Sequence, residues 1–264
     1  MKCRLCGGND LSLYYTQGSE DQFRFYKCSR CELVNLDLTG LNLIEHQEKY
    51  ATEYLDPDDP FINRGSLASY QFIRRHLPKP GRFLDVGCGN GALLAAAQRE
   101  GWNVRGLELS EFLAQNVRER FGVEVDVSDF LTWRPTDSGF DLVSLRHVLE
   151  HLPNSLGAMG SINQLLRMGG HALLEFPNIE GISFNVKRSL AKVGLHKKRY
   201  ADSWRPGHCN EFSRNSFRYL AEETGFSVKV WETYAYSPIK NFLYNHIPIG
   251  TKARVLIEKI ETLP

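Results

Sequence analysis

Phe83-Leu84-Asp85-Val86-Gly87-Cys88-Gly89-Asn90-Gly91 is a short apolar run that breaks into three glycines at alternate positions. Strong helix formers follow directly at residues 92–97. A strand, a glycine turn and a helix in this order present a ligand site at the carboxyl end of the first strand of an α/β sheet. Because glycines let the backbone approach a ligand and adopt positive φ, the stretch predicts a nucleotide-like ligand at this turn.

Strand and helix patterns alternate after the turn. Ser110 is a predicted N-cap for a helix at residues 111–121, and Met168-Gly169-Gly170 is a predicted turn. This alternation predicts an α/β fold with a mostly parallel sheet and helices on both faces. The strands are predicted at residues 83–86, 104–108, 122–127, 140–145, 171–176 and 226–231.

Two acidic positions follow strands of this predicted sheet. Glu108 closes the second strand, where a carboxylate accepts hydrogen bonds from a ribose diol. Asp129 and Phe130 follow the third strand, where an acid beside an aromatic ring can bind an adenine amino group and flank the base. The alternative for Asp129 is a simple helix cap.

The length, composition and net charge of the chain restrict the class of protein. A chain of 264 residues with 42% hydrophobic and 24% charged residues has room for one large domain and a small appendage. Its net charge of +1 provides no general field for nucleic acid or an anionic membrane. No apolar run has the length of a membrane span, and no apolar segment follows the N-terminus as in a secretory signal. We therefore expect a cytoplasmic protein with reduced thiols.

Four of the six cysteines form two CxxC pairs. Cys3 and Cys6 are followed, after 21 residues, by Cys28 and Cys31. This spacing predicts a zinc ribbon over residues 1–40, with a structural Zn²⁺ held by four thiolates. Metal binding would supply the stability that so small a segment lacks. The alternatives are four unrelated cysteines or a redox pair.

A helical connector is predicted between the ribbon and the core, over residues 41–79. Tyr50 and Tyr54 lie one helical turn apart and could share a face. They either pack against the core or form a lid over the ligand. The remaining residues, 80–264, are predicted to form the main domain, with an insertion at 178–212.

The core motifs together resemble class I S-adenosylmethionine (SAM)-dependent methyltransferases. Residues 84–91 resemble motif I of that family, with glycines spaced G-x-G-x-G rather than in the dinucleotide pattern G-x-G-x-x-G. Glu108, Asp129-Phe130 and residues 140–143 match its later motifs in order and spacing. The resemblance implies a Rossmann-like sheet, SAM as cofactor, Gly87 and Gly89 at the methionine part, Glu108 at the ribose, and Asp129 with Phe130 at the adenine. The full set of predicted cofactor-binding residues is Asp85, Gly87, Gly89, Glu108, Asp129, Phe130, Leu145, Tyr50 and Tyr54.

Residues 145–152 narrow the resemblance to a subgroup that contains ubiquinone-biosynthesis O-methyltransferases. A zinc ribbon joined to such a core is similar to methyltransferases of sugar, polysaccharide and natural-product pathways. The resemblance implies a transferase (EC 2.1.1.-) that methylates an oxygen of a sugar, glycolipid or secondary metabolite.

Methyl transfer requires alignment of a nucleophile and uptake of its proton. His147, Glu150 and His151 follow the fourth strand and are predicted to share one helical face. The quinone O-methyltransferases that this segment resembles have acid-x-x-acid-His here, associated with a divalent metal, and His147 replaces the first acid. General base, metal ligand and structural cap are all open interpretations.

The insertion at residues 178–212 supplies another candidate. A loop of this length in a compact domain is usually functional. His208, near its end, is the first choice for a substrate-facing base, and the alternative is that it packs against the following helix. The insertion is basic, which indicates a solvated face, a phosphate-bearing substrate, or peripheral contact of residues 182–200 with a membrane or lipid-linked substrate.

The tail and two other functions leave further alternatives. Residues 234–264 are amphipathic and could cap the sheet, form a homodimer or contact a membrane.

An RNA methyltransferase that binds RNA through the ribbon is disfavoured, because RNA binding calls for a positive footprint. A non-catalytic SAM-binding subunit is the third hypothesis. We therefore predict a small-molecule acceptor and no nucleic-acid partner.

Overall fold

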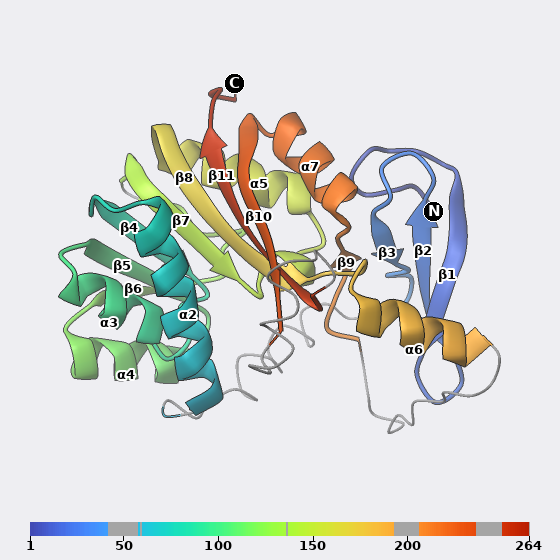
Figure 1. Ribbon diagram of the computed structural model, residues 1–264, viewed down its shortest axis with the longest axis horizontal. Coiled ribbons are helices and arrows are strands. Elements are labelled where there is room, and N and C mark those ends of the chain that lie inside the picture. The colour runs from blue at the N-terminus through green and yellow to red at the C-terminus, as the bar shows by residue number, and fades with distance from the viewer. Residues whose placement is uncertain (42–57, 59, 136, 193–205, 236–249, 264) are drawn as a thin grey trace.

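The computed structural model describes residues 1–41, 58, 60–135, 137–192, 206–235 and 250–263. These residues form two β-sheets (Figure 1). The larger sheet has seven strands in the order β10-β11-β8-β7-β4-β5-β6. All its neighbouring pairs are parallel except those made by β11, as the predicted mostly parallel sheet requires. Its strands are β4 (Arg82–Val86), β5 (Asn103–Glu108), β6 (Glu124–Val127), β7 (Phe140–Arg146), β8 (Leu166–Pro177), β10 (Phe226–Tyr234) and β11 (Lys252–Lys259).

Helices cover both faces of this sheet, which confirms the predicted α/β layers (Figure 1). One face packs against α2 (Pro60–His76), α3 (Ala92–Arg99) and α4 (Glu111–Phe121). The other packs against α5 (Ser155–Leu165) and α7 (Arg214–Glu223). Each face has its own cluster of buried apolar side chains, so the sheet lies between two cores.

Local sequence explains where these helices begin and end. Helix α4 has the predicted bounds, because Ser110 Oγ accepts a hydrogen bond from Leu113 N–H and Gly122 ends the helix with a φ of 64°. The predicted turn at residues 168–170 is wrong. Strand β8 already begins at Leu166, and a shift of its register with β7 lets the chain pass through Gly169 at a φ of 70°.

The tail contains a strand that the sequence pattern did not predict. Strand β11 lies inside the sheet, antiparallel to both β10 and β8. Val255 and Ile257 are fully buried there, so this part of the tail is neither a cap on the sheet nor a surface for a membrane or a second copy. The antiparallel direction brings Lys252, at the start of β11, to the carboxyl edge of the parallel strands.

The smaller sheet joins the N-terminal ribbon to the insertion. It has the order β1-β2-β3-β9, where β9 belongs to the insertion. Leu5 and Leu33 of the ribbon belong to the same core cluster as Phe212 and Phe217. Other apolar residues of the ribbon form a separate cluster with Ile179 of the insertion: Phe23, Phe25, Val34 and Leu36. Helix α6 (Ile182–Lys192) lies beside the ribbon, and its Arg188 guanidinium is 4.0 Å from the centre of the Tyr14 ring (Figure 1). The other strands are β1 (Leu11–Gln17), β2 (Phe23–Cys28), β3 (Val34–Leu36) and β9 (Asn210–Glu211).

Some predictions fall outside the described residues. Tyr50 and Tyr54 lie in the segment 42–57, so the proposed lid is not described. The same applies to residues 193–205 of the insertion and 236–249 of the tail. Among the helices that the structure describes, none combines the length and the apolar character needed to cross a bilayer.

We expect Ile257→Ala to destabilise the protein by about 3 kcal/mol, because it leaves a cavity in the middle of the sheet. Ile260→Ala is the matched control: Ile260 is 57% exposed, whereas Ile257 is fully buried, so the control should change stability by at most about 0.5 kcal/mol. Urea unfolding followed by circular dichroism measures both. Equal losses in the two variants would contradict the placement of β11.

Candidate active site

The glycine turn after β4 faces open space at one position. Gly87, Gly89 and Gly91 have φ values of 69°, 55° and 72°, which other residues rarely adopt. A Cβ on Gly87 would lie 2.6 Å from Val148 Cγ2, and one on Gly91 would lie 2.7 Å from Val117 Cγ2. A Cβ on Gly89 would meet no atom of the described residues within 4 Å. Packing therefore requires glycine at the outer two positions, while Gly89 borders a space that a ligand could fill.

Glu108 is bonded directly to this turn from the end of β5. Its Oε2 accepts a hydrogen bond from Gly89 N–H at 2.8 Å, and its Oε1 accepts bonds from the N–H groups of Leu109 and Ser110 at 2.9 and 3.0 Å. A carboxylate has about four acceptor positions, so these three bonds leave capacity for a ligand hydroxyl. Glu108 thus holds the turn and borders the same space.

Asp85 and Leu145 lie beneath the turn rather than beside the space. Asp85 is 1% exposed and accepts a hydrogen bond from Ser144 Oγ. Burial raises its pKa to about 7, against the opposing effects of Arg146 and Ser144. Leu145 is fully buried in β7, where it pairs with Val86 of β4. Both residues support the turn from the interior of the sheet.

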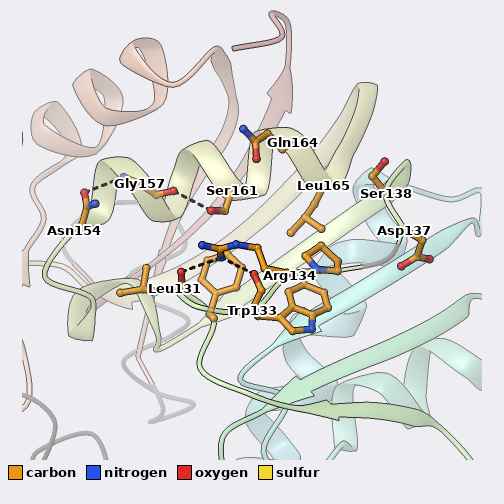
Figure 2. Close-up of a pocket in the computed structure, with 12 residues that line it drawn as sticks. Leu131, Trp133, Arg134, Asp137, Ser138, Asn154, Gly157, Ser161, Gln164 and Leu165 are labelled. Atoms are coloured by element: carbon orange, nitrogen blue, oxygen red, sulfur yellow. Dashed lines mark hydrogen bonds between the residues drawn. The ribbon is translucent and has the colours of Figure 1, made fainter. Parts of the chain in front are cut away.

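Asp129 and Phe130 begin the segment after β6. Asp129 Oδ1 accepts a hydrogen bond from Leu131 N–H at 2.7 Å, so one carboxylate oxygen caps this turn. Phe130 is 7% exposed and packs in the core. Its ring also lines a cavity of about 690 Å³ between residues 130–138 and α5, with Arg134 in its middle (Figure 2). Among the predicted site residues that the structure describes, Phe130 alone lines this cavity, and no residue of the glycine turn does.

His147 is not helical, so the predicted shared helical face is wrong. Strand β7 continues to Arg146, His147 then adopts a φ of 56°, and a short 3₁₀ helix, η1 (Leu149–His151), follows. The ring of His147 nevertheless lies close to two charged groups. Its Nδ1 is 3.3 Å from Glu150 Oε1, and its Nε2 is 3.1 Å from Lys252 Nζ. Since an ammonium can only donate, Nε2 accepts from Lys252, and Nδ1–H is left to donate to Glu150.

His208 of the insertion meets Glu150 and His151 at the carboxyl edge of the sheet. One candidate ligand atom from each of the three residues lies within 4.8 Å of the other two. The rings of His151 and His208 are 5.1 Å apart and perpendicular. His151 Nδ1 is 2.7 Å from Gly207 O, so this nitrogen carries the proton and Nε2 of the neutral ring has the lone pair. The segment at residues 147–151 and the insertion at residues 178–212 were separate candidates in the sequence, and the structure brings them together in one cluster.

In this cluster, burial and the neighbouring charges shift the pKa values in opposite directions. Burial alone would raise the pKa of Glu150, but His147, His151 and His208 outweigh it and hold the pKa at about 2. Burial lowers the pKa of His208, yet Glu211 and Glu150 raise it above its usual value. Burial also lowers the pKa of Lys252 to about 8. Neighbouring opposite charges thus stabilise a buried carboxylate beside imidazole rings.

Two carboxylate oxygens in the cluster lack partners among the described residues. They are Oε2 of Glu150 and Oε2 of Glu211, both buried. Glu211 Oε1 lies 3.7 Å from His208 Nδ1. Buried acceptors without donors normally bind water or a ligand. Two imidazoles and a carboxylate suit either proton transfer or a divalent cation, whose ligands would be Glu150, His151 and His208 rather than His147.

Glu175 is a buried charge that the sequence analysis missed. It is 1% exposed in β8, and its carboxylate accepts hydrogen bonds from Ser69 Oγ at 2.6 Å, Arg254 Nε at 2.5 Å and Tyr234 OH at 3.0 Å. Arg146 Nε lies 3.4 Å away. The network joins α2, β7, β10 and β11, beside His147.

Lys252, Glu211 and Glu175 were missed because their partners lie far away in the chain. Lys252 and Arg254, a partner of Glu175, belong to β11, which was not predicted. Glu211 lies in the two-residue strand β9, which pairs with β3 of the ribbon. A lone acid in a strand pattern carries no local sign of its distant partners.

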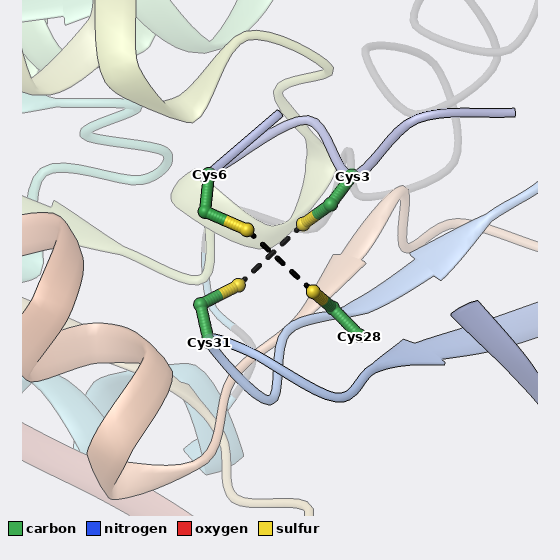
Figure 3. Close-up of side chains that lie close together, drawn as sticks. All are labelled: Cys3, Cys6, Cys28 and Cys31. Carbon is green, nitrogen blue, oxygen red and sulfur yellow. Dashed lines mark hydrogen bonds between the residues drawn. The ribbon is translucent and has the colours of Figure 1, made fainter. Parts of the chain in front are cut away.

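The four predicted zinc ligands lie together in the ribbon (Figure 3). Their Sγ atoms are all within 4.8 Å of one another, and the pairs Cys3–Cys31 and Cys6–Cys28 are each 3.5 Å apart. A tetrahedral zinc with Zn–S bonds of about 2.3 Å places its ligands about 3.8 Å apart, so the cluster has the right size. The hydrogen bond between Cys3 and Cys31 lowers the pKa of the Cys3 thiol and raises the pKa of the Cys31 thiol.

Comparison with known proteins finds a matching family model and similar relatives. The model of the methyltransferase domain family matches residues 62–229. A ubiquinone biosynthesis O-methyltransferase of Methylococcus capsulatus is 30% identical over 232 residues, which cover 81% of this chain and 93% of that protein. A ubiquinone biosynthesis O-methyltransferase of Xylella fastidiosa is 28% identical over 182 residues, which cover 62% of this chain and 72% of that protein.

Solved structures share the fold at lower identity. A 1,6-didemethyltoxoflavin-N1-methyltransferase of Burkholderia thailandensis has a TM-score of 0.61 at 15% identity, covering 94% of this chain and 100% of that one. The PH0226 protein of Pyrococcus horikoshii has a TM-score of 0.60 at 17% identity, covering 80% of this chain and 98% of that one. At these identities the likeness concerns the fold alone.

We expect Glu175→Gln to cost about 3 kcal/mol at pH 7, because it leaves Arg146 and Arg254 buried without their counter-charge. Burial raises the pKa of Glu175, but the two arginines outweigh it and hold the pKa at about 2, below the ordinary value of 4.5. The stabilisation is therefore complete above about pH 4.5 and is lost as the pH falls toward 2.

Urea unfolding at pH 7, 4 and 3 measures this difference. The gap between wild type and Glu175→Gln should narrow as the pH falls. Glu223→Gln, at an exposed position of α7, is the control and should show no gap at any pH. A gap for Glu175→Gln that is independent of pH would refute the charged network.

Proposed function

This chain belongs to the methyltransferase domain family and has the class I SAM-dependent methyltransferase fold, and we propose that it transfers the methyl group of SAM to an oxygen of a small-molecule acceptor. One observation carries the proposal: His208, His151 and Glu150 converge on one another, in the cluster that begins two residues after Val148. Val148, between His147 and η1, lies directly against Gly87. The methyl donor and the proton acceptor would therefore face the same space.

The space beside Gly89 is the proposed SAM site. Gly89 lets the methionine part approach the backbone, and Glu108 accepts a ribose hydroxyl with its remaining acceptor capacity. Asp129 contributes to the adenine end with the oxygen that does not cap its own turn. Asp85 and Leu145 act from below, by supporting the turn. Bound SAM supplies a positively charged sulfonium, from which the methyl group leaves readily.

His208 is the proposed general base. The acceptor hydroxyl oxygen would attack the methyl carbon of bound SAM, and the electrons of the broken carbon–sulfur bond would remain on the sulfur of the S-adenosylhomocysteine product. The hydroxyl proton moves to Nε2 of His208, while Glu211 beside Nδ1 stabilises the imidazolium that forms. His151, held by Gly207 O, supports the His208 ring from its edge. A pKa of His208 above its usual value makes it a stronger base near neutral pH.

An oxygen acceptor fits this arrangement better than an acceptor that is already nucleophilic. A hydroxyl group is a weak nucleophile until its proton is taken up, and an imidazole paired with a carboxylate provides that uptake. The curated relatives at 28–30% identity are named O-methyltransferases. We propose a sugar, glycolipid or secondary metabolite as the acceptor. Contact of residues 182–200 with a phosphate-bearing or lipid-linked acceptor or a membrane stays a prediction, as does a homodimer.

The four cysteines of the ribbon are proposed to hold a structural Zn²⁺. All four positions of a tetrahedral ion would be filled by thiolates, so no position is open for catalysis. Part of the ribbon packs into the main core, and residues 1–40 contain five basic and five acidic side chains, so they lack the positive footprint that RNA binding requires. The proposal of an RNA methyltransferase is therefore not favoured.

We expect Glu108→Ala to weaken SAM binding at least tenfold, because the turn loses the acceptor of Gly89 N–H and the ribose loses its partner. Isothermal titration calorimetry with SAM measures the affinity. Glu111→Ala, at an exposed position on α4, should bind as wild type does. An unchanged affinity of Glu108→Ala would remove this residue from the site.

We expect His208→Ala to lower turnover about 100-fold or more while leaving SAM affinity unchanged, because loss of a general base affects proton uptake alone. The acceptor is first identified by comparing metabolites with and without the protein, as a mass gain of one methylene. S-adenosylhomocysteine release with that acceptor then gives the turnover. His171→Ala, near the other end of β8, is the control. Turnover of His208→Ala at the control's rate would exclude His208 as the base.

A further inference from the structure

The strip of chain that carries His208 is held by the ribbon. Strand β9 pairs with β3 of the ribbon, with Asn210 opposite Asn35 and Glu211 opposite Val34. In the described residues around it, an isolated bridge also joins Phe212 to Asn178, the residue that follows β8. The placement of His208 therefore depends on a sheet built by the first 36 residues.

Arg4 fastens this strip from the ribbon side. Its Nη2 donates to the carbonyl oxygen of Cys209, and its Nε and Nη2 donate to Asn210 Oδ1 at 3.2 and 3.1 Å. Its Nη1 donates to Leu36 O at 2.8 Å. A guanidinium is suited to this role, because it presents several donors in one rigid plane. One side chain thus bridges β3 and the two residues that follow His208.

Cys209 and Asn210 also form hydrogen bonds with the segment that contains Glu150. Cys209 N–H donates to Glu150 O at 2.8 Å, and Asn210 Nδ2 donates to Leu152 O at 2.7 Å. Cys209 and Asn210 thus lie between Arg4 on one side and η1 with its following residue on the other. The arrangement places His208 against His151.

The position of Arg4 depends in turn on the four-cysteine cluster. Arg4 lies between Cys3 and Cys6, two of the four proposed zinc ligands. Its backbone N–H donates to Asn35 Oδ1 at 3.0 Å, and Asn35 Nδ2 lies 3.7 Å from Cys3 Sγ. A metal bound to both cysteines would fix the short loop from which the guanidinium extends.

We infer that Arg4 is a positioning residue for His208, and that through it an occupied four-cysteine site orders the strip 207–211 at the active site. The inference rests on the proposed function only in assigning a chemical task to His208. The contacts of Arg4 stand without that assignment.

The first test compares Arg4→Met with Arg30→Met by hydrogen–deuterium exchange. Arg30 is the matched control, because it lies inside the other CxxC pair and is exposed. Arg4→Met should retain zinc, measured by elemental analysis, and bind SAM as wild type does. Amide exchange in residues 206–213 should rise about tenfold, while residues 84–91 remain protected. Arg30→Met should change neither segment.

Two further variants separate the interactions of the strip from zinc binding. Arg4→Lys keeps one charged donor and should recover part of the protection of residues 206–213. Asn210→Ala removes both the Oδ1 acceptor of Arg4 and the Nδ2 donor to Leu152 O, and it leaves the CxxC pairs unaltered, so it should loosen the same segment. Unchanged exchange of residues 206–213 in Arg4→Met and in Asn210→Ala would overturn the positioning role.

The second test removes the metal from the wild-type protein with a chelator. Zinc removal should increase exchange in residues 206–213 and leave residues 84–91 and SAM affinity unchanged. Protein that contains no metal as purified, or a strip that stays protected after metal removal, would overturn the link to the four-cysteine site. If Arg4→Met loosens the strip but turnover persists, the positioning role holds and the proposed base role of His208 fails.

Discussion

The absence of a side chain at Gly87 lets Val148 lie against the glycine turn, and the arrangement of the candidate site depends on that contact. It brings the segment after β7 next to the turn after β4. His147 leaves the strand at a positive φ, and Glu150 and His151 then follow in one short 3₁₀ turn. A larger residue at position 87 would separate the proposed methyl donor from the proposed base.

The other part of the candidate site is His208, which belongs to the insertion at residues 178–212. His208 reaches the carboxyl edge because β9 pairs with the ribbon and because Cys209 N–H binds Glu150 O. The ribbon is therefore joined to the catalytic core through backbone hydrogen bonds as well as through shared apolar packing. This gives the four cysteines a structural reason to occur in the same chain as a methyltransferase core.

Local patterns predicted most of the fold correctly. Helix α4 has caps at both ends, and β4 and β7 are largely apolar stretches. Local patterns did not predict β11, a strand whose position depends on residues far away in the chain. Strand β11 is buried on both faces and lies antiparallel between two strands from elsewhere in the chain, so no alternation marks it. The helical spacing from His147 to His151 misled for a related reason, because it carries no information about the positive φ at His147.

The sequence by itself determined the family, the glycine turn and the grouping of four cysteines, because each depends on residues close together in the chain. Only the tertiary structure decided that His208 joins Glu150 and His151, that Lys252 and Glu175 lie beside them, and that Arg4 fastens the strip after His208. These contacts link residues up to 206 positions apart. They arise from sheet pairing and burial, and no local spacing encodes such contacts.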